Sequence, residues 1–76
     1  MNRQSNTVES LACRARDIAQ HSPSAKVGTI VIRYADDTTV GATCDCASDT
    51  LQYSVRGLRV SPEQVAATLA VYERRR

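Results

Sequence analysis

Three stretches in the middle of the chain decide the fold: 27-VGTIVIRYA-35, 39-TVGATCDC-46 and 50-TLQYSVR-56. Each alternates apolar and polar side chains with the period of two that is typical of a strand with one buried face. The connections between them are too short for a crossover, so the pattern predicts two hairpins and a three-stranded antiparallel sheet. The predicted buried face carries Ile30, Ile32, Tyr34, Val40, Ala42, Cys44, Leu51, Tyr53 and Val55.

Amphipathic helices are predicted on both sides of these strands. Residues 7–20 carry apolar side chains at spacings of three and four, with Asn6 and Glu9 as the expected capping box. Residues 62–74 follow a serine that is a favourable N-cap, and Gly57 is expected to end the third strand. The predicted order is therefore α-β-β-β-α, a two-layer α+β fold with both helices on one face of the sheet.

The length of the chain, 76 residues, is enough for one domain and too small for two. We expect that domain to span residues 1–76, with 1–5 and 75–76 frayed. A core of this size rarely contributes more than about 3–5 kcal/mol, so either a homodimer or a marginal monomer is expected. The candidate dimer contacts are the exposed sheet edges and the weakly polar back of the second helix, formed by Ala67, Ala70 and Val71.

The three cysteines and the single histidine raise the question of a metal site. Cys44 and Cys46 fall on the same face of a strand, and Cys13 with His21 would complete a Cys₃His set for zinc. The spacing C-D-C differs from the C-x₂₋₄-C knuckle of zinc sites, so we interpret Cys44 and Cys46 as small core residues. Nucleophile motifs, paired catalytic carboxylates and a glycine-rich phosphate loop are not evident, which predicts a protein that is not an enzyme and holds no cofactor or metal.

The composition also bears on location. No apolar run approaches the roughly 18 residues of a membrane span, and residues 1–10 contain no apolar stretch of signal-peptide type. A small, odd number of cysteines fits reduced thiols. We therefore expect a cytoplasmic protein with no membrane partner.

The formal net charge of +2 conceals an acidic centre between two basic ends. Four aspartates lie in or beside the two predicted hairpin turns. One interpretation is that they form the turns and solubilise them. The other is an acidic surface that competes for a basic groove on a larger host protein or nucleoprotein complex. The candidate partner-binding residues are Asp36, Asp37, Thr39, Thr43, Asp45 and Asp49.

In size and charge layout the chain is similar to small phage-encoded inhibitors of bacterial defence, the anti-CRISPR proteins among them. That similarity implies an inhibitor or adaptor that works by protein–protein contact, and this is the function that we expect.

The predicted element order is similar to that of double-stranded RNA-binding domains. The resemblance implies RNA contacts from the first helix, the first hairpin loop and a lysine cluster that opens the last helix. Here residues 35–38 and 61–64 are neutral or acidic, and carboxylates repel phosphates. Nucleic-acid binding is therefore the alternative function, and its candidate contacts are Arg74, Arg75 and Arg76 at the C-terminus.

Overall fold

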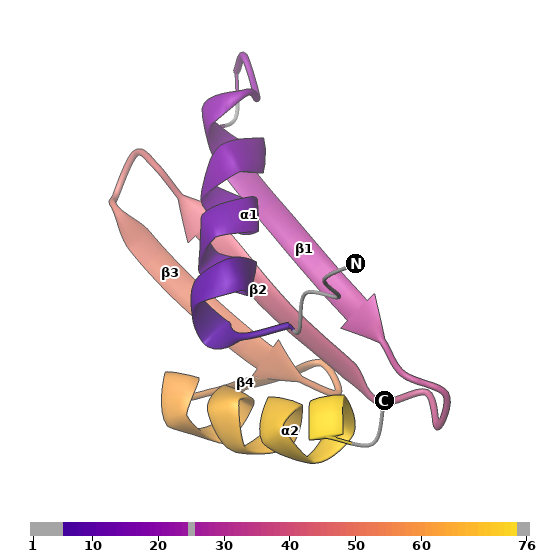
Figure 1. The fold of residues 1–76 in the computed structure, drawn as a ribbon. Helices are drawn as coiled ribbons and strands as arrows, with labels where there is room; N and C mark the ends of the chain where they lie inside the picture. Colours follow the sequence, from indigo (N-terminus) through magenta and orange to yellow (C-terminus); the bar gives the residue numbers. More distant parts are fainter. Residues whose placement is uncertain (1–5, 25, 75–76) are drawn as a thin grey trace.

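A computed structural model describes residues 6–24 and 26–74 of the chain (Figure 1). The described residues form an α+β fold with an antiparallel sheet. The predicted fraying of 1–5 and 75–76 lies outside the described residues. The elements, in chain order, are α1 (Val8–Gln20), β1 (Val27–Arg33), β2 (Thr39–Asp45), β3 (Thr50–Val55), β4 (Leu58–Val60) and α2 (Pro62–Arg74).

The described sheet has four strands in the order β1-β2-β3-β4, so the expectation of three strands is wrong. The added strand, β4, pairs antiparallel with β3, and Leu58 lies opposite Val55. Arg56 and Gly57 connect the two strands with φ angles of 56° and 80°. Positive φ at both central positions is typical of the two-residue type I′ hairpin turn, whose twist matches that of the flanking strands. Arginine is not a usual residue for such a turn, so the sequence pattern did not indicate a hairpin here.

The start of α1 lies one residue later than the expected capping box. Thr7 is the N-cap, and its hydroxyl accepts a hydrogen bond from the Ser10 amide at 3.0 Å. The Ser10 hydroxyl accepts in return from the Thr7 amide at 2.9 Å, which completes the box. The predicted pairing of Asn6 with Glu9 is therefore wrong, and Asn6 instead bonds to Glu73 at the other end of the chain.

Small residues bring α1 close to the sheet. Ala15 and Ala19 on the helix are fully buried, and Gly28 of β1 lies beneath them. A Cβ atom at Gly28 would lie 2.3 Å from the Ala15 carbonyl oxygen and 2.4 Å from the Ala19 amide nitrogen. The backbone of helix and strand therefore meet at a distance that only glycine permits.

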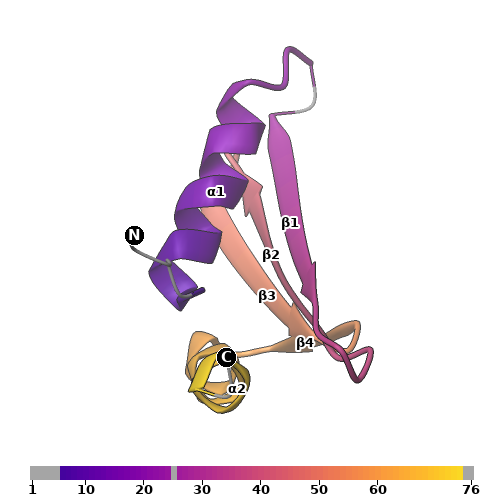
Figure 2. The same cartoon turned by 45° about the vertical axis from the view of Figure 1, so that its right-hand side comes forward.

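The second helix, α2, lies across one end of the sheet, beyond the first turn of α1 (Figures 1 and 2). Its side chains Val65 and Leu69 are buried in the same cluster as Leu11 of α1 and Val40 of β2. One hydrophobic core therefore joins both helices to the sheet. The two helices contact different strands: α1 packs mainly on β1 and β2, whereas α2 packs on β3.

Candidate functional site

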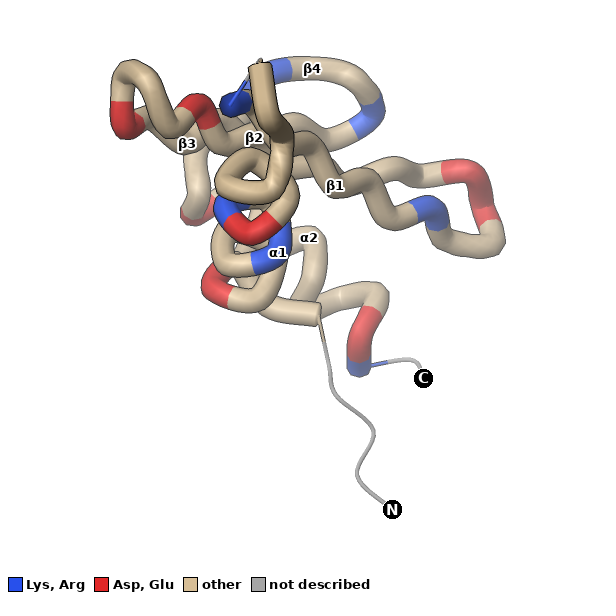
Figure 3. Tube along the Cα trace, turned by 90° about the horizontal axis from the view of Figure 1, so that it is seen from above, with Lys and Arg blue, Asp and Glu red and all other residues tan. Residues whose placement is uncertain are grey.

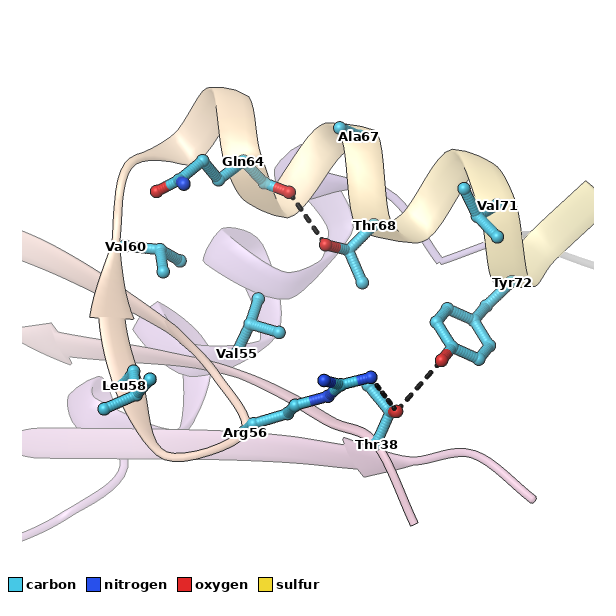
Figure 4. Close-up of a pocket in the computed structure, with 10 residues that line it drawn as sticks. All are labelled: Thr38, Val55, Arg56, Leu58, Val60, Gln64, Ala67, Thr68, Val71 and Tyr72. Atoms are coloured by element: carbon cyan, nitrogen blue, oxygen red, sulfur yellow. Dashed lines mark hydrogen bonds between the residues drawn. The ribbon is translucent and has the colours of Figure 1, made fainter. Parts of the chain in front are cut away.

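An open groove runs between α2 and the β3–β4 hairpin (Figure 4). Its volume is about 500 Å³. The sheet contributes Val55, Leu58 and Val60. The helix α2 contributes the apolar Ala67 and Val71 together with the polar Gln64 and Thr68. Apart from its polar end, the groove is therefore walled mostly by apolar side chains.

The apolar walls are unusually exposed. Leu58 is 70% exposed and Val71 is 48% exposed. Leu58 lies opposite Val55, so its side chain points to the same face of the sheet as the helices. It is nevertheless exposed because α1 packs mainly on β1 and β2, and β4 lies at the other edge of the sheet. Neighbouring large apolar side chains that stay in water mark interaction surfaces more often than isolated ones do.

One end of the groove is polar. Thr38, which is almost fully buried, lies with its hydroxyl 2.9 Å from the Tyr72 hydroxyl. Tyr72 also donates a hydrogen bond to the Asp36 carboxylate, and this bond is the main cause that lowers the pKa of Asp36 to about 2. Arg56 extends from the hairpin turn, and its guanidinium donates to the Thr38 hydroxyl at 3.4 Å. Among the described residues, no carboxylate lies within salt-bridge distance of that guanidinium.

The last turn of α2 is tied to the β1–β2 turn by aromatic and polar contacts. The rings of Tyr34 and Tyr72 stack with centroids 4.6 Å apart and an angle of 20° between their planes. The Tyr34 hydroxyl donates to the Glu73 carboxylate, which also accepts two hydrogen bonds from Asn6 at 3.1 Å. These contacts attach the C-terminal end of α2, which forms one wall of the groove, to the β1–β2 turn.

Each predicted acidic residue has a role in its own turn. Asp36 accepts a hydrogen bond from the Thr38 amide, and Asp45 accepts one from the Ala47 amide, both at 3.0 Å. Asp37 and Asp49 occupy left-handed backbone positions with φ of 69° and 55°. Aspartate is favoured in both kinds of position, because its short side chain bonds locally and tolerates the left-handed region.

The four aspartates do not form one patch. Asp36 and Asp37 lie at one end of β2, and Asp45 and Asp49 lie at the other, roughly 20 Å away along the strand. The red segments of the two turns accordingly lie on opposite sides of the molecule in Figure 3. Between them, on the sheet face that α1 does not cover, the Thr43 hydroxyl lies 3.0 Å from that of Thr29, and Thr39 pairs with Arg33.

The other sequence candidates are spread over the molecule. Arg74 is the exposed last residue of α2, and residues 75–76 lie outside the described part of the chain. Cys44 is buried in the core, Cys46 is half-buried beside it, and Cys13 is exposed on α1. Within 6–24 and 26–74 no three histidine, cysteine, aspartate or glutamate side chains come together in a way that could hold a metal ion. In the same residues no helix has the length and apolar character needed to cross a membrane.

The groove residues Arg56, Leu58 and Val60 were missed in the sequence. The available signal was the alternation 58-LRV-60 directly after a two-residue turn that ends in glycine. Comparisons of the chain with protein-family models, with curated proteins and with solved structures found no match. The fourth strand also breaks the α-β-β-β-α order on which the similarity to double-stranded RNA-binding domains depended. Function therefore has to be inferred from the groove itself.

Proposed function

We propose that this chain is a small, non-enzymatic protein-binding module whose groove between α2 and the β3–β4 hairpin takes an apolar segment of a partner protein. The observation that carries the proposal is the exposure of Leu58 on the hairpin wall and Val71 on the helix wall of one groove. Burial of such side chains contributes about 25 cal/mol per Å² of apolar surface removed from water. Apolar grooves of this kind typically take the apolar face of a helix or strand from a partner.

The polar end of the groove favours an acidic residue on the bound segment. Within the described part of the chain the Arg56 side chain donates one hydrogen bond, the 3.4 Å contact with Thr38, so the other donors of its guanidinium stay available. Its charge also acts on the nearby Asp36 carboxylate. A carboxylate on the bound segment, placed at this end, would form a charge-assisted hydrogen bond with it. The proposed occupant is therefore an apolar segment with an acidic residue beside it.

We further propose that binding inhibits or adapts a larger host protein in the cytoplasm, as the similarity to anti-CRISPR inhibitors implies. In that case the acidic turns assist by steering a basic partner toward the molecule. Asp37→Asn and Asp49→Asn test this role, because asparagine keeps the left-handed turn while the charge is lost. We expect these variants to slow association at low salt and to leave it unchanged at high salt.

The groove is tested by affinity capture from a lysate of the native host, with the wild-type chain and three variants. Leu58→Asp and Val71→Asp place a charge in the groove, and Ala70→Asp is the matched control because Ala70 is exposed on α2 but does not line the groove. We expect a stoichiometric partner that the wild type and Ala70→Asp retain and the two groove variants lose by about tenfold or more.

Two results would contradict the groove. Equal capture by all four proteins would move the binding site elsewhere. Disappearance of every partner after nuclease treatment would favour direct nucleic-acid binding through the basic C-terminus instead.

A further inference from the structure

The outer edge of β1 is the long free edge of the described sheet. Among the residues that the structure describes, β1 and β4 are the two edge strands, and β1 is paired with β2 only. β4 has three residues and presents little edge, whereas β1 has seven. In Figure 1 the helix α1 lies over the face of the sheet and leaves the outer side of β1 uncovered. Such an edge carries unpaired backbone donors and acceptors that can pair with another strand.

The hydrogen bonds at both ends of β1 identify the groups that point outward. The Lys26 carbonyl accepts from the Cys46 amide, and the Tyr34 amide donates to the Thr38 carbonyl, both at 2.9 Å. Even-numbered residues therefore bond inward to β2, because bonded positions alternate along an antiparallel strand. The amides and carbonyls that point to the free edge belong to Val27, Thr29, Val31 and Arg33.

Apolar side chains flank this edge on both faces of the sheet. Val27 is 40% exposed and Val31 is 57% exposed on the face away from the helices. On the helix side Ile18, which is 42% exposed, and Ile30 line a shallow ledge. Natural edge strands are commonly blunted by lysine, proline or a bulge, and 27-VGTIVIR-33 contains neither lysine nor proline and pairs without a bulge.

We propose that β1 pairs antiparallel with β1 of a second copy of this chain, about a two-fold axis at Ile30. This register sets Val27 opposite Arg33 and Thr29 opposite Val31 of the other copy, so every outward backbone group finds a partner. It also keeps Arg33 away from the Arg33 of the other copy, which avoids a repulsion between like charges. The four-stranded sheets of the two copies join into one continuous sheet.

The helix side of the edge supports the choice of a second copy as the partner. Arg14 and Asp17 of α1 line the same ledge as Ile18 and Ile30. A two-fold axis brings this ledge against itself, and we expect Arg14 of one copy to face Asp17 of the other as unlike charges. Within the chain Arg14 donates to Asn6 at 3.2 Å and Asp17 lies 3.5 Å from His21, and both contacts are exposed. Pairing also stabilises a core that is small for an independent domain.

This interface is separate from the proposed groove. The groove lies at β3, β4 and α2, at the other edge of the sheet, so the dimer can form with the groove empty or filled. Failure of one proposal therefore leaves the other standing.

The test is the mass of the full chain by sedimentation over a series of concentrations. Val31→Pro removes an outward amide without removing a bond to β2, and Val31→Lys places two lysines diagonally across the axis. Gln52→Lys is the matched control, since Gln52 is exposed on the same sheet face but lies on β3. We expect wild type and Gln52→Lys to dimerise, and both Val31 variants to raise the dissociation constant by about tenfold or more.

Amide exchange gives a second readout. We expect the backbone amide hydrogens of Thr29, Val31 and Arg33 to exchange slowly with solvent in the dimer. Their exchange rates should rise when dilution dissociates the dimer. A wild-type chain that stays monomeric at every concentration overturns the proposal. So does a dimer that both Val31 variants leave intact, because its interface must then lie elsewhere. If Val31→Pro does not fold by circular dichroism, Val31→Lys decides.

Discussion

At the scale of single residues, aspartates build the turns of this chain. Asp37 and Asp49 hold left-handed positions, and Asp36 and Asp45 accept hydrogen bonds from amides two residues further on. Asp36 does more, because its second carboxylate oxygen accepts from Tyr72, which is 36 positions away in the sequence. The local roles follow from known turn chemistry, whereas the contact with Tyr72 exists only in the folded molecule.

The contact with Tyr72 makes stability depend on pH. Folding lowers the pKa of Asp36 from 3.8 to about 2, with the Tyr72 hydrogen bond as the main cause. The ionised form is therefore favoured in the folded state, and its stabilising effect is present above pH 3.8 and is lost as the pH falls toward 2. We expect Asp36→Asn to lower the free energy of unfolding at pH 6, and the difference from wild type to shrink as the pH falls to about 2. Urea unfolding across this range measures it, with Asp37→Asn as the control in the same turn. A difference that stays constant with pH would contradict this role of Asp36.

At the scale of elements, the contact of α1 with β1 depends on a missing side chain. Gly28 lies under Ala15 and Ala19, where a Cβ atom would come within 2.4 Å of backbone atoms. Backbone atoms cannot turn away as a side chain can, so the whole helix would have to move. The sequence marks residues 27–35 as a strand, but nothing in its alternation shows that the glycine faces a helix.

We expect Gly28→Ala to destabilise the chain by about 1–3 kcal/mol, because it overpacks the helix–strand contact. Gly41→Ala is the matched control on β2. Its nearest neighbour would be the Ser54 hydroxyl at 3.0 Å, which can rotate, so we expect a smaller loss. Chemical denaturation of both variants at one protein concentration measures the free energies. Equal losses at the two glycines would show that the helix adapts to the added methyl group.

At the scale of the whole molecule, α2 belongs to the same core as α1 while leaving a groove beside it. Val65 and Leu69 are buried in the core, and Ala67 and Val71 are among the residues that line the groove. The helix is held at its far end through Tyr72 and the β1–β2 turn. This arrangement predicts that buried and groove-lining leucines contribute very differently to stability.

We expect Leu69→Ala to cost about 2–5 kcal/mol, since Leu69 is only 3% exposed. Leu58→Ala, at 70% exposure, should change stability by less than about 0.5 kcal/mol. Far-ultraviolet circular dichroism and tyrosine fluorescence during urea unfolding should give one coincident transition for the wild type. Separate transitions would mean that α2 unfolds independently of the sheet, and then the two helices do not share one core.

Local chemistry allowed the sequence to predict the helices, the three long strands and their faces. Alternation marked Ile30, Val40 and Leu51 as inward side chains, and all three pack in or against the core. The sequence pattern placed the α1 cap one residue too early because Asn6 and Thr7 are both favourable caps. In the structure Thr7 caps the helix with Ser10 as its partner, and Asn6 bonds to the Glu73 carboxylate. The sequence pattern missed β4 because three residues after an unusual turn carry too little periodic signal.

The sequence by itself determined which strand residues share the face toward the core, because successive side chains of a strand point to opposite faces and the apolar ones alternate. Only the tertiary structure decided the surfaces on which function is proposed. The groove exists because α2 and the β3–β4 hairpin meet at an end of the sheet that α1 does not cover, and the acidic turns separate because β2 lies between them. These are relations between residues far apart in the sequence, and the long-range packing that creates them leaves no local pattern to recognise.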